Sequence, residues 1–262
     1  MPKTDYDYIV VGSGNAGLNV ALLARDHGSV LIITKGNIDD CNTRYAQDGI
    51  AAAVDPGDSV ELHLRDTLSA GAGLCDTQAV EVLTADGPER VNNLMRWGVA
   101  FDREEGPGGG PADGAQTSQV ALGREGAHSM ARILYAGGDA TGMHIELALT
   151  EQVARSAQSQ SPITVLEHTL ATLLIIEDGQ VKGLETTNSN TGQKGSFTGR
   201  FVVLATGGAG QLFRYTTNPS VATGDGVALA FRAGAQVMDM EFYQFHPTAF
   251  RMTGSDPFLM SE

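Results

Sequence analysis

Three glycines near the amino end, Gly12, Gly14 and Gly17, have the G-x-G-x-x-G spacing that binds the diphosphate of a dinucleotide. The first glycine allows a tight turn, the second lets a phosphate approach the backbone, and the third lets a helix pack closely on a strand. Backbone N–H groups at the start of that helix would then hold the anionic diphosphate. The alternative is a glycine-rich turn that binds no ligand.

The segments around these glycines have the pattern that a dinucleotide site needs. Residues 8–11 and 30–33 are uninterrupted apolar runs, which are typical of buried parallel strands. Between them, Leu18 and Leu22 lie on one face of an expected helix. Residues 6–34 are therefore expected to form one strand–helix–strand unit, and this context favours dinucleotide binding over an empty turn.

The end of the second strand lacks the acidic residue that an NAD-binding unit places on the ribose, about 20 positions after the glycines. Thr34 and Lys35 stand there instead. The Thr34 hydroxyl can bond a ribose, and Lys35 can place a positive charge near the adenosine or phosphate end. Charge alone equally allows Lys35 to be a solvated loop cation. The missing acid argues against an NAD-dependent dehydrogenase.

The rest of the chain predicts further helices and a group of strands. Helical periodicity indicates helices at 77–97, 140–159 and 226–235. From residue 163 the pattern becomes that of strands, at 163–166, 169–176, 181–187 and 201–205. We interpret these strands as a small β-meander inserted in a parallel-sheet α/β domain, with the chain returning to the parallel sheet at 201–205. The Gly- and Pro-rich segment 104–111 is expected to be a surface loop without chemistry.

Composition excludes several classes of protein. The 262 residues include 17 Lys plus Arg against 31 Asp plus Glu, a net charge of −14, and no basic stripe for nucleic acid. No apolar run approaches the ~18 residues of a membrane span, and the first residues lack the apolar stretch of a signal peptide. Cys41 and Cys75 make no disulfide framework, and no His or Cys spacing indicates a metal site. We therefore expect a cytoplasmic protein without membrane, nucleic-acid or metal partners.

Seven short motifs follow one another along the chain: GSGNAG at 12–17, NTRYAQDGIAA at 42–52, REGAHS at 124–129, ATGG at 205–208, YTTNP at 215–219, TGDG at 223–226 and EFYQFHPT at 241–248. In this order they resemble the succinate dehydrogenase and fumarate reductase flavoprotein family, and most closely its aspartate-oxidising branch. The resemblance covers essentially the whole chain. It implies an incomplete Rossmann-like FAD-binding domain at 1–240, followed at 241–262 by the start of a capping domain.

The resemblance implies that FAD is the cofactor. The residues that would bind it are Gly12, Ser13, Gly14, Asn15, Ala16, Gly17, Lys35, Asn42, Thr43, Arg44, Tyr45, Ala46, Gln47, Asp48, Gly49, Gly207 and Asp225. In the succinate dehydrogenase branch, a His that is covalently attached to the flavin stands at the position of Asn42. A side-chain amide cannot form that bond, so FAD is expected to be held non-covalently.

For the substrate, the resemblance implies catalytic roles for Glu125 and His246, and substrate binding by Gln244, His246, Ser261 and Glu262. A carboxylate such as Glu125 is unfavourable beside a plain dicarboxylate but suits the ammonium group of L-aspartate. Without the family context, Glu125 would be interpreted as a surface ion pair with Arg124 or Arg132. His246 would then be interpreted as a buried histidine bonded to the backbone.

The intact enzyme, by resemblance, oxidises L-aspartate to iminoaspartate with oxygen or fumarate as electron acceptor. This is the first step toward quinolinate and NAD, so quinolinate synthase is a candidate partner. Family members continue beyond the position of Glu262 and carry their catalytic Arg there, so residues 1–262 alone are expected to be inactive. Two alternatives remain open: a fumarate reductase or succinate dehydrogenase-type flavoprotein, and a non-catalytic FAD-binding fragment.

Overall fold

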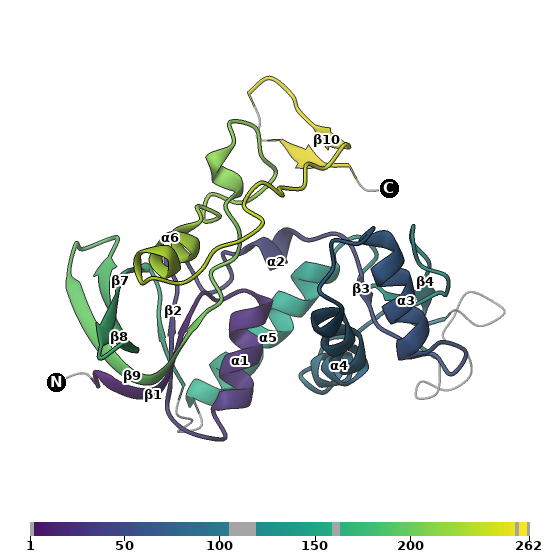
Figure 1. Cartoon of the computed structure of the whole chain (residues 1–262). Coiled ribbons are helices and arrows are strands. Elements are labelled where there is room, and N and C mark those ends of the chain that lie inside the picture. Colours follow the sequence, from purple (N-terminus) through teal and green to yellow (C-terminus); the bar gives the residue numbers. More distant parts are fainter. Residues whose placement is uncertain (1–2, 105–118, 159–162, 255–256, 261–262) are drawn as a thin grey trace. The chain divides into compact units, whose positions relative to one another are not determined.

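The computed structural model describes residues 3–104, 119–158, 163–254 and 257–260 (Figure 1). Tertiary contacts divide the chain into two compact units. Unit 1 consists of Met1–Tyr45 and Leu149–Glu262, and unit 2 consists of Ala46–Ala148. Unit 2 is therefore an insertion between two parts of unit 1. The division into domains at 240/241 stays a prediction.

Unit 1 is built on a six-stranded sheet with the order β6-β2-β1-β9-β8-β7. Its strands are β1 (Asp5–Val11), β2 (Val30–Ile33), β6 (Ile163–Leu166), β7 (Thr169–Glu177), β8 (Gln180–Asn188) and β9 (Lys194–Leu204). Strands β6, β2, β1 and the last part of β9 run parallel, and β7, β8 and the first part of β9 form an antiparallel meander. The predicted α/β class, with a parallel sheet and an inserted meander, is confirmed.

Two strands differ from the sequence-based expectation. Strand β6 pairs with β2 at the edge of the parallel sheet, with Val30 opposite Ile163, and does not belong to the meander. Strand β9 is continuous: it pairs with β8 up to Thr198 and with β1 from Thr198 onward. The predicted return to the parallel sheet at 201–205 is therefore confirmed, but it occurs within one longer strand. Alternating hydrophobicity predicts that a segment is a strand but does not choose its neighbours.

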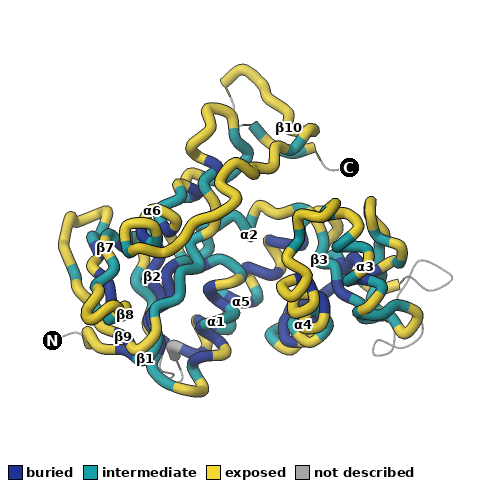
Figure 2. Tube along the Cα trace, viewed as in Figure 1, coloured by how far each residue is buried: buried dark blue, intermediate teal, exposed yellow. Residues whose placement is uncertain are grey.

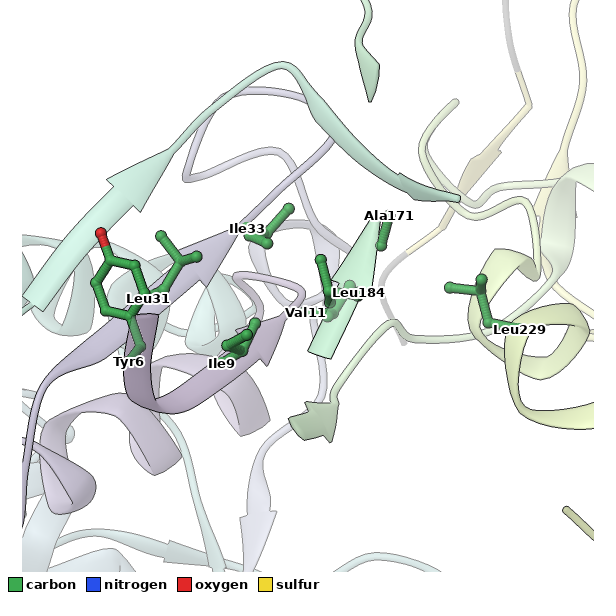
Figure 3. Close-up of a cluster of buried hydrophobic side chains, with 8 residues drawn as sticks. All are labelled: Tyr6, Ile9, Val11, Leu31, Ile33, Ala171, Leu184 and Leu229. Atoms are coloured by element: carbon green, nitrogen blue, oxygen red, sulfur yellow. The ribbon is translucent and has the colours of Figure 1, made fainter. Parts of the chain in front are cut away.

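The core of unit 1 holds the strands next to the glycine turn in place. All four residues of β2 are buried (Figure 2). Ile9 and Val11 of β1 pack in one apolar cluster with Leu31 and Ile33 of β2 and with Leu184 of β8 (Figure 3). Burial of each such side chain contributes about 1.5–3 kcal/mol. The carboxyl ends of β1 and β2 are therefore rigidly placed.

Helices and short elements complete unit 1. Helix α1 (Asn15–Ala24) follows the glycine turn and packs against β1 and β2, and α6 (Asp225–Arg232) packs against β7. The remaining elements are the single turn α2 (Asn42–Tyr45), the 3₁₀ turn η1 (Gly210–Leu212) and the hairpin of β10 (Ala249–Phe250) with β11 (Phe258–Leu259). Helix α5 (Thr141–Gln158) begins in unit 2 and ends in unit 1.

Unit 2 combines a small antiparallel sheet with two packed helices. The sheet has the order β3-β5-β4, formed by β3 (Ile50–Ala51), β5 (Ile133–Leu134) and β4 (Leu122–Gly123). Helices α3 (Val60–Ala70) and α4 (Thr77–Arg96) pack on each other. Ser59 and Asp76 cap them by accepting hydrogen bonds from the N–H groups of the first turn.

Helix α1 lies where the sequence predicts it, between β1 and β2, and three further predicted helices are confirmed, whereas α3 and the single turn α2 were missed. Helices α4, α5 and α6 lie within a few residues of the predicted ranges. Helix α3 was not predicted; the capping residue Ser59 was the available signal. Within the described ranges, no helix carries an apolar stretch long enough to cross a bilayer.

Candidate functional site

A cavity of about 340 Å³ lies in unit 1 at the carboxyl edge of the parallel strands. The last residues of three of these strands line it, namely Val11, Ile33 and Leu204, together with the start of α1. Strand β1 lies between β2 and β9, so the connections lead away from it on both sides. Open α/β sheets bind their ligands at such a switch point. The volume is in the range of small-molecule sites, ~300–1,000 Å³.

The glycine turn has the backbone that its spacing predicts. Gly12 has φ of 108°, and a Cβ added there would lie 2.1 Å from the carbonyl oxygen of Ala205. A Cβ at Gly17 would lie 2.0 Å from the carbonyl oxygen of Gly12. Both positions therefore require glycine, the first for conformation and close approach and the second for helix packing. Gly14 stands at the N-cap of α1.

The start of α1 offers backbone donors to an anion. The N–H groups of a first helical turn have no partner within the helix. That of Asn15 is bound by Thr43 Oγ1 at 3.0 Å. Those of Ala16 and Gly17 have no acceptor among the residues that the structure describes, and Ala16 lines the cavity. A diphosphate in the cavity can therefore accept hydrogen bonds from this turn.

The end of β2 is tied to the glycine turn. Ser13 Oγ donates a hydrogen bond to Thr34 Oγ1 at 3.0 Å, and both residues are buried. The hydroxyl of Thr34, which the sequence offered to a ribose, thus supports the turn itself. Thr34 and Lys35 both line the cavity.

Lys35 is not a solvated cation. Its Nζ bonds Asp225 Oδ2 at the start of α6 and Thr223 Oγ1. Thr223 Oγ1 also donates to Asp225 Oδ2 at 2.7 Å. Burial opposes the ionisation of Asp225, but the hydrogen bonds from Lys35 and Thr223 outweigh it and lower its pKa. Lys35 and Asp225, predicted separately as cofactor residues, form one pair at the cavity wall.

The second motif, predicted to face the cofactor, is divided between the units. Asn42 and Thr43 of α2 line the cavity, whereas Tyr45 is exposed. Arg44 forms an ion pair with Asp39. The remaining residues of the predicted segment, Ala46, Gln47, Asp48 and Gly49, belong to unit 2. Gly207, also predicted, lines the cavity after β9.

Sequence reasoning missed some of the cavity wall. Asp40 and Cys41 line it just before α2, and Thr169–Ala171 line it at the start of β7. The Gly226 backbone also approaches the end of β9 closely, since a Cβ there would lie 1.7 Å from Thr206 Oγ1. The TGDG motif, which ends at Gly226, was the signal in the sequence for this close approach to Thr206.

In unit 2, Glu125 lies in the turn between β4 and β5 and is exposed. Its Oε1 accepts a hydrogen bond from the Tyr135 hydroxyl at 2.5 Å. The two arginines that could have neutralised it bond elsewhere: Arg124 Nε donates to the His128 carbonyl, and Arg132 binds Asp58 and Asp66. The carboxylate of Glu125 has no cationic partner among the described residues, which suits a cationic ligand.

Burial and the bond to Glu125 raise the pKa of Tyr135 to about 12. A raised pKa means a contribution to stability that is complete below pH ~10 and is lost as pH rises toward 12.

We expect Tyr135→Phe to leave the phenolate absorbance unchanged below about pH 11 relative to the wild-type chain, because Tyr135 is still protonated there. We expect Glu125→Gln to add phenolate absorbance in this range. If Tyr135→Phe had less phenolate absorbance than the wild-type chain at pH 10, the raised pKa of Tyr135 would be contradicted.

Arg132 is the centre of a buried ion cluster that sequence reasoning did not find. Its Nε and Nη2 donate to the two oxygens of Asp58 at 2.8 and 2.9 Å, and its Nη1 donates to Asp66 Oδ2 at 2.6 Å. Asp66 Oδ2 also accepts from the N–H and hydroxyl of Ser129. Arg132 and Asp58 have fully buried side chains. The cluster fixes the turn that carries Glu125.

The carboxyl-terminal candidates lie in unit 1. His246 is half-buried, and its Nδ1 lies 2.8 Å from Thr248 Oγ1. Gln244 is exposed. Ser261 and Glu262 lie outside the described residues, as does most of the loop predicted at 104–111. Among the described residues, no group of His, Cys, Asp or Glu is arranged to hold a metal ion.

The protein family described as FAD binding domain matches residues 7–262. The chain belongs to this family. FAD is its cofactor, as predicted. This FAD-binding chain is 48% identical over 255 residues to an L-aspartate oxidase of Streptomyces coelicolor and 42% identical over 264 residues to that of Synechocystis sp.. These alignments cover 95% and 100% of the chain but 41% and 44% of the relatives. The chain thus spans less than half the length of these relatives.

Solved structures agree with this membership. A quinol fumarate reductase of E. coli matches with a TM-score of 0.87 and 31% identity, covering 100% of this chain and 42% of that one. The Sdh1 complex of Mycobacterium smegmatis matches with a TM-score of 0.85 and 32% identity, covering 95% and 42%. The predicted resemblance to succinate dehydrogenase and fumarate reductase flavoproteins is confirmed.

The residues of the cavity fit FAD. The glycine turn has no room for a Cβ at Gly12. Within the described part of the chain, the N–H groups of Ala16 and Gly17 have no acceptor, so they are available to a diphosphate. Asn42 Oδ1 is buried without a hydrogen-bond partner among the described residues, as expected for a group that receives a donor from a ligand. An amide at this position also suits a cofactor held without a covalent bond.

Proposed function

We propose that this chain is the FAD-binding part of an enzyme that oxidises L-aspartate to iminoaspartate. The observation that carries the proposal is the glycine-lined cavity of unit 1 in a chain that is 48% identical to an L-aspartate oxidase. The chain alone is proposed to bind FAD without turning over substrate. Oxygen or fumarate as electron acceptor, a cytoplasmic location and quinolinate synthase as consumer of the product belong to the same proposal.

FAD, when bound, supplies the acceptor for the two electrons that leave the substrate. The chain's own residues bind and orient. The N–H groups of Ala16 and Gly17 would hold the diphosphate, and the Lys35–Asp225 pair lines the same cavity. Asn42 contributes hydrogen bonding without a covalent bond.

We propose that the substrate is recognised by two kinds of side chain, one that binds its ammonium group and one that binds a carboxylate. Glu125 binds the ammonium group of L-aspartate, because a carboxylate without a cationic partner attracts a positive charge. His246 and Gln244 contact a substrate carboxylate. The alternative, a fumarate reductase or succinate dehydrogenase-type flavoprotein, is supported by the structural matches. Glu125 argues against it, since succinate offers no cation.

The test compares this chain with a chimera in which the chain is continued by the residues that follow the matched segment in the Streptomyces coelicolor relative. Both are loaded with FAD and mixed with L-aspartate or succinate. We expect FAD binding by both proteins, hydrogen peroxide only from the chimera, and only with L-aspartate. Faster flavin reduction by succinate would favour the alternative, and peroxide from the chain alone would contradict the inactivity of the fragment.

In the same chimera, we expect Glu125→Gln to lower kcat/KM for L-aspartate roughly 10- to 100-fold, the loss of a hydrogen bond to a charged group. Glu81→Gln is the matched control, because Glu81 is an exposed residue of α4 in the same unit. Its kcat/KM should equal that of the unmodified chimera. An equal loss in both variants would remove Glu125 from substrate binding.

A further inference from the structure

The motif YTTNP at residues 215–219 has no role in the site described so far. Its Asn218 is 176 residues from Asn42 in the sequence, yet Asn42 Nδ2 donates a hydrogen bond to Asn218 Oδ1 at 3.1 Å. Both residues belong to unit 1. The motif therefore reaches the side chain that begins the predicted flavin-facing segment.

Asn218 itself is held on several sides. Its backbone N–H and its Nδ2 each donate to Thr216 Oγ1 at 3.1 Å. Its carbonyl oxygen accepts from Gln211 Nε2 at 2.8 Å. The Gly210 backbone lies against its side chain, where a Cβ would be 2.4 Å from Asn218 Cγ. The amide of Asn218 therefore has a fixed orientation and is not free to follow Asn42.

Asn42 is in the opposite situation. It lines the cavity, and its donor group is taken by Asn218. Its acceptor Oδ1 is buried with no partner within the described ranges. A buried carbonyl oxygen is costly to leave unpaired. FAD carries hydroxyl and N–H donors that could satisfy it. The pairing with Asn218 leaves the acceptor edge of Asn42 available to such a donor.

We propose that Asn218 is a positioning residue for the cofactor, which acts by fixing the side-chain amide of Asn42. The order of contacts is Thr216, Asn218, Asn42 and then the cofactor. This inference rests on the proposed contact between Asn42 and FAD. The YTTNP segment would thus orient one of the residues that bind the cofactor, namely Asn42.

The test is a double-mutant cycle on FAD binding by the 262-residue chain. The dissociation constant is measured by quenching of FAD fluorescence for Asn218→Ala, Asn42→Ala and the double variant. We expect each single variant to bind roughly 5-fold more weakly, the loss typical of a neutral hydrogen bond. The double variant should bind no more weakly than Asn42→Ala, and both single variants should shift the absorbance spectrum of bound FAD alike.

Two further variants separate positioning from loss of fold. Thr216→Val keeps the volume but removes the acceptor that holds Asn218, and it should weaken FAD binding less than Asn218→Ala does. Asn190→Ala alters an exposed residue of the β8–β9 turn and should change nothing. Additive losses in the double variant, or an unchanged affinity of Asn218→Ala, would overturn the inference while the wild-type chain still binds FAD. A wild-type chain that binds no FAD would instead defeat the proposed function, and the inference with it.

Discussion

Gly12→Ala is expected to abolish FAD retention by the chain. The new methyl group would lie 2.1 Å from the carbonyl oxygen of Ala205, in a backbone with φ of 108° that alanine rarely adopts. The conformational strain costs about 1–3 kcal/mol, and overpacking against a rigid strand end costs about 1–3 kcal/mol more. The turn must move, which displaces the N–H groups of Ala16 and Gly17 from the diphosphate. FAD content after purification measures the loss of cofactor binding, and urea unfolding measures the loss of stability.

Gly87→Ala is the control for this substitution. Gly87 lies in α4 of unit 2, its φ is not positive, and a Cβ there would make only an ordinary contact, 3.9 Å from Ala52 Cβ. We expect Gly87→Ala to fold and bind FAD like the wild-type chain. If Gly12→Ala retained FAD with wild-type affinity, the glycine turn would not be the diphosphate site.

Arg132→Met is expected to destabilise unit 2 by about 3–5 kcal/mol, the cost of breaking a buried ion pair by removing one partner. Methionine keeps much of the volume but leaves the carboxylates of Asp58 and Asp66 without their cation. Urea unfolding followed by the fluorescence of Trp97 measures the loss, because the chain has a single Trp and it lies in unit 2. Arg90→Met is the control, since the ion pair of Arg90 with Glu89 is exposed and its loss should cost about 0–1 kcal/mol.

The pH dependence of this loss gives a second check. Hydrogen bonds from Ser129 and Arg132 lower the pKa of Asp66, and the pKa of Asp58 is lowered because its bonds from Arg132 and Ser59 outweigh burial. A lowered pKa means stability that is present above the ordinary value of 3.8 and is lost as pH falls through the folded-state value. Without Arg132 both carboxylates can take up protons, so the destabilisation by Arg132→Met should shrink as pH falls below 4. A loss independent of pH would indicate a packing defect.

Local elements could be predicted from the sequence because their signals lie within a few residues. The apolar run at 30–33 matches β2, and the period of residues 77–97 matches α4 to within a residue. Gly12, with its positive φ, stands where the motif places a tight turn. Short-range sterics and side-chain periodicity decide such features, and both are written in consecutive residues.

Partner choice could not be predicted in this way. Lys35 could equally have been a solvated cation, and Glu125 could have paired with Arg132. The tertiary fold instead brings Lys35 to Asp225, and Arg132 to Asp58. Residue type restricts the kind of partner a side chain accepts but does not identify it.

Consecutive residues were enough to predict the glycine turn, the strand–helix–strand unit and, through the motifs, the cofactor. The folded chain was needed to find that unit 2 interrupts unit 1, that β9 belongs to both the meander and the parallel sheet, and that Asn42 bonds Asn218. Backbone conformation is a local property, whereas a contact between residues 176 positions apart depends on how the whole unit is assembled.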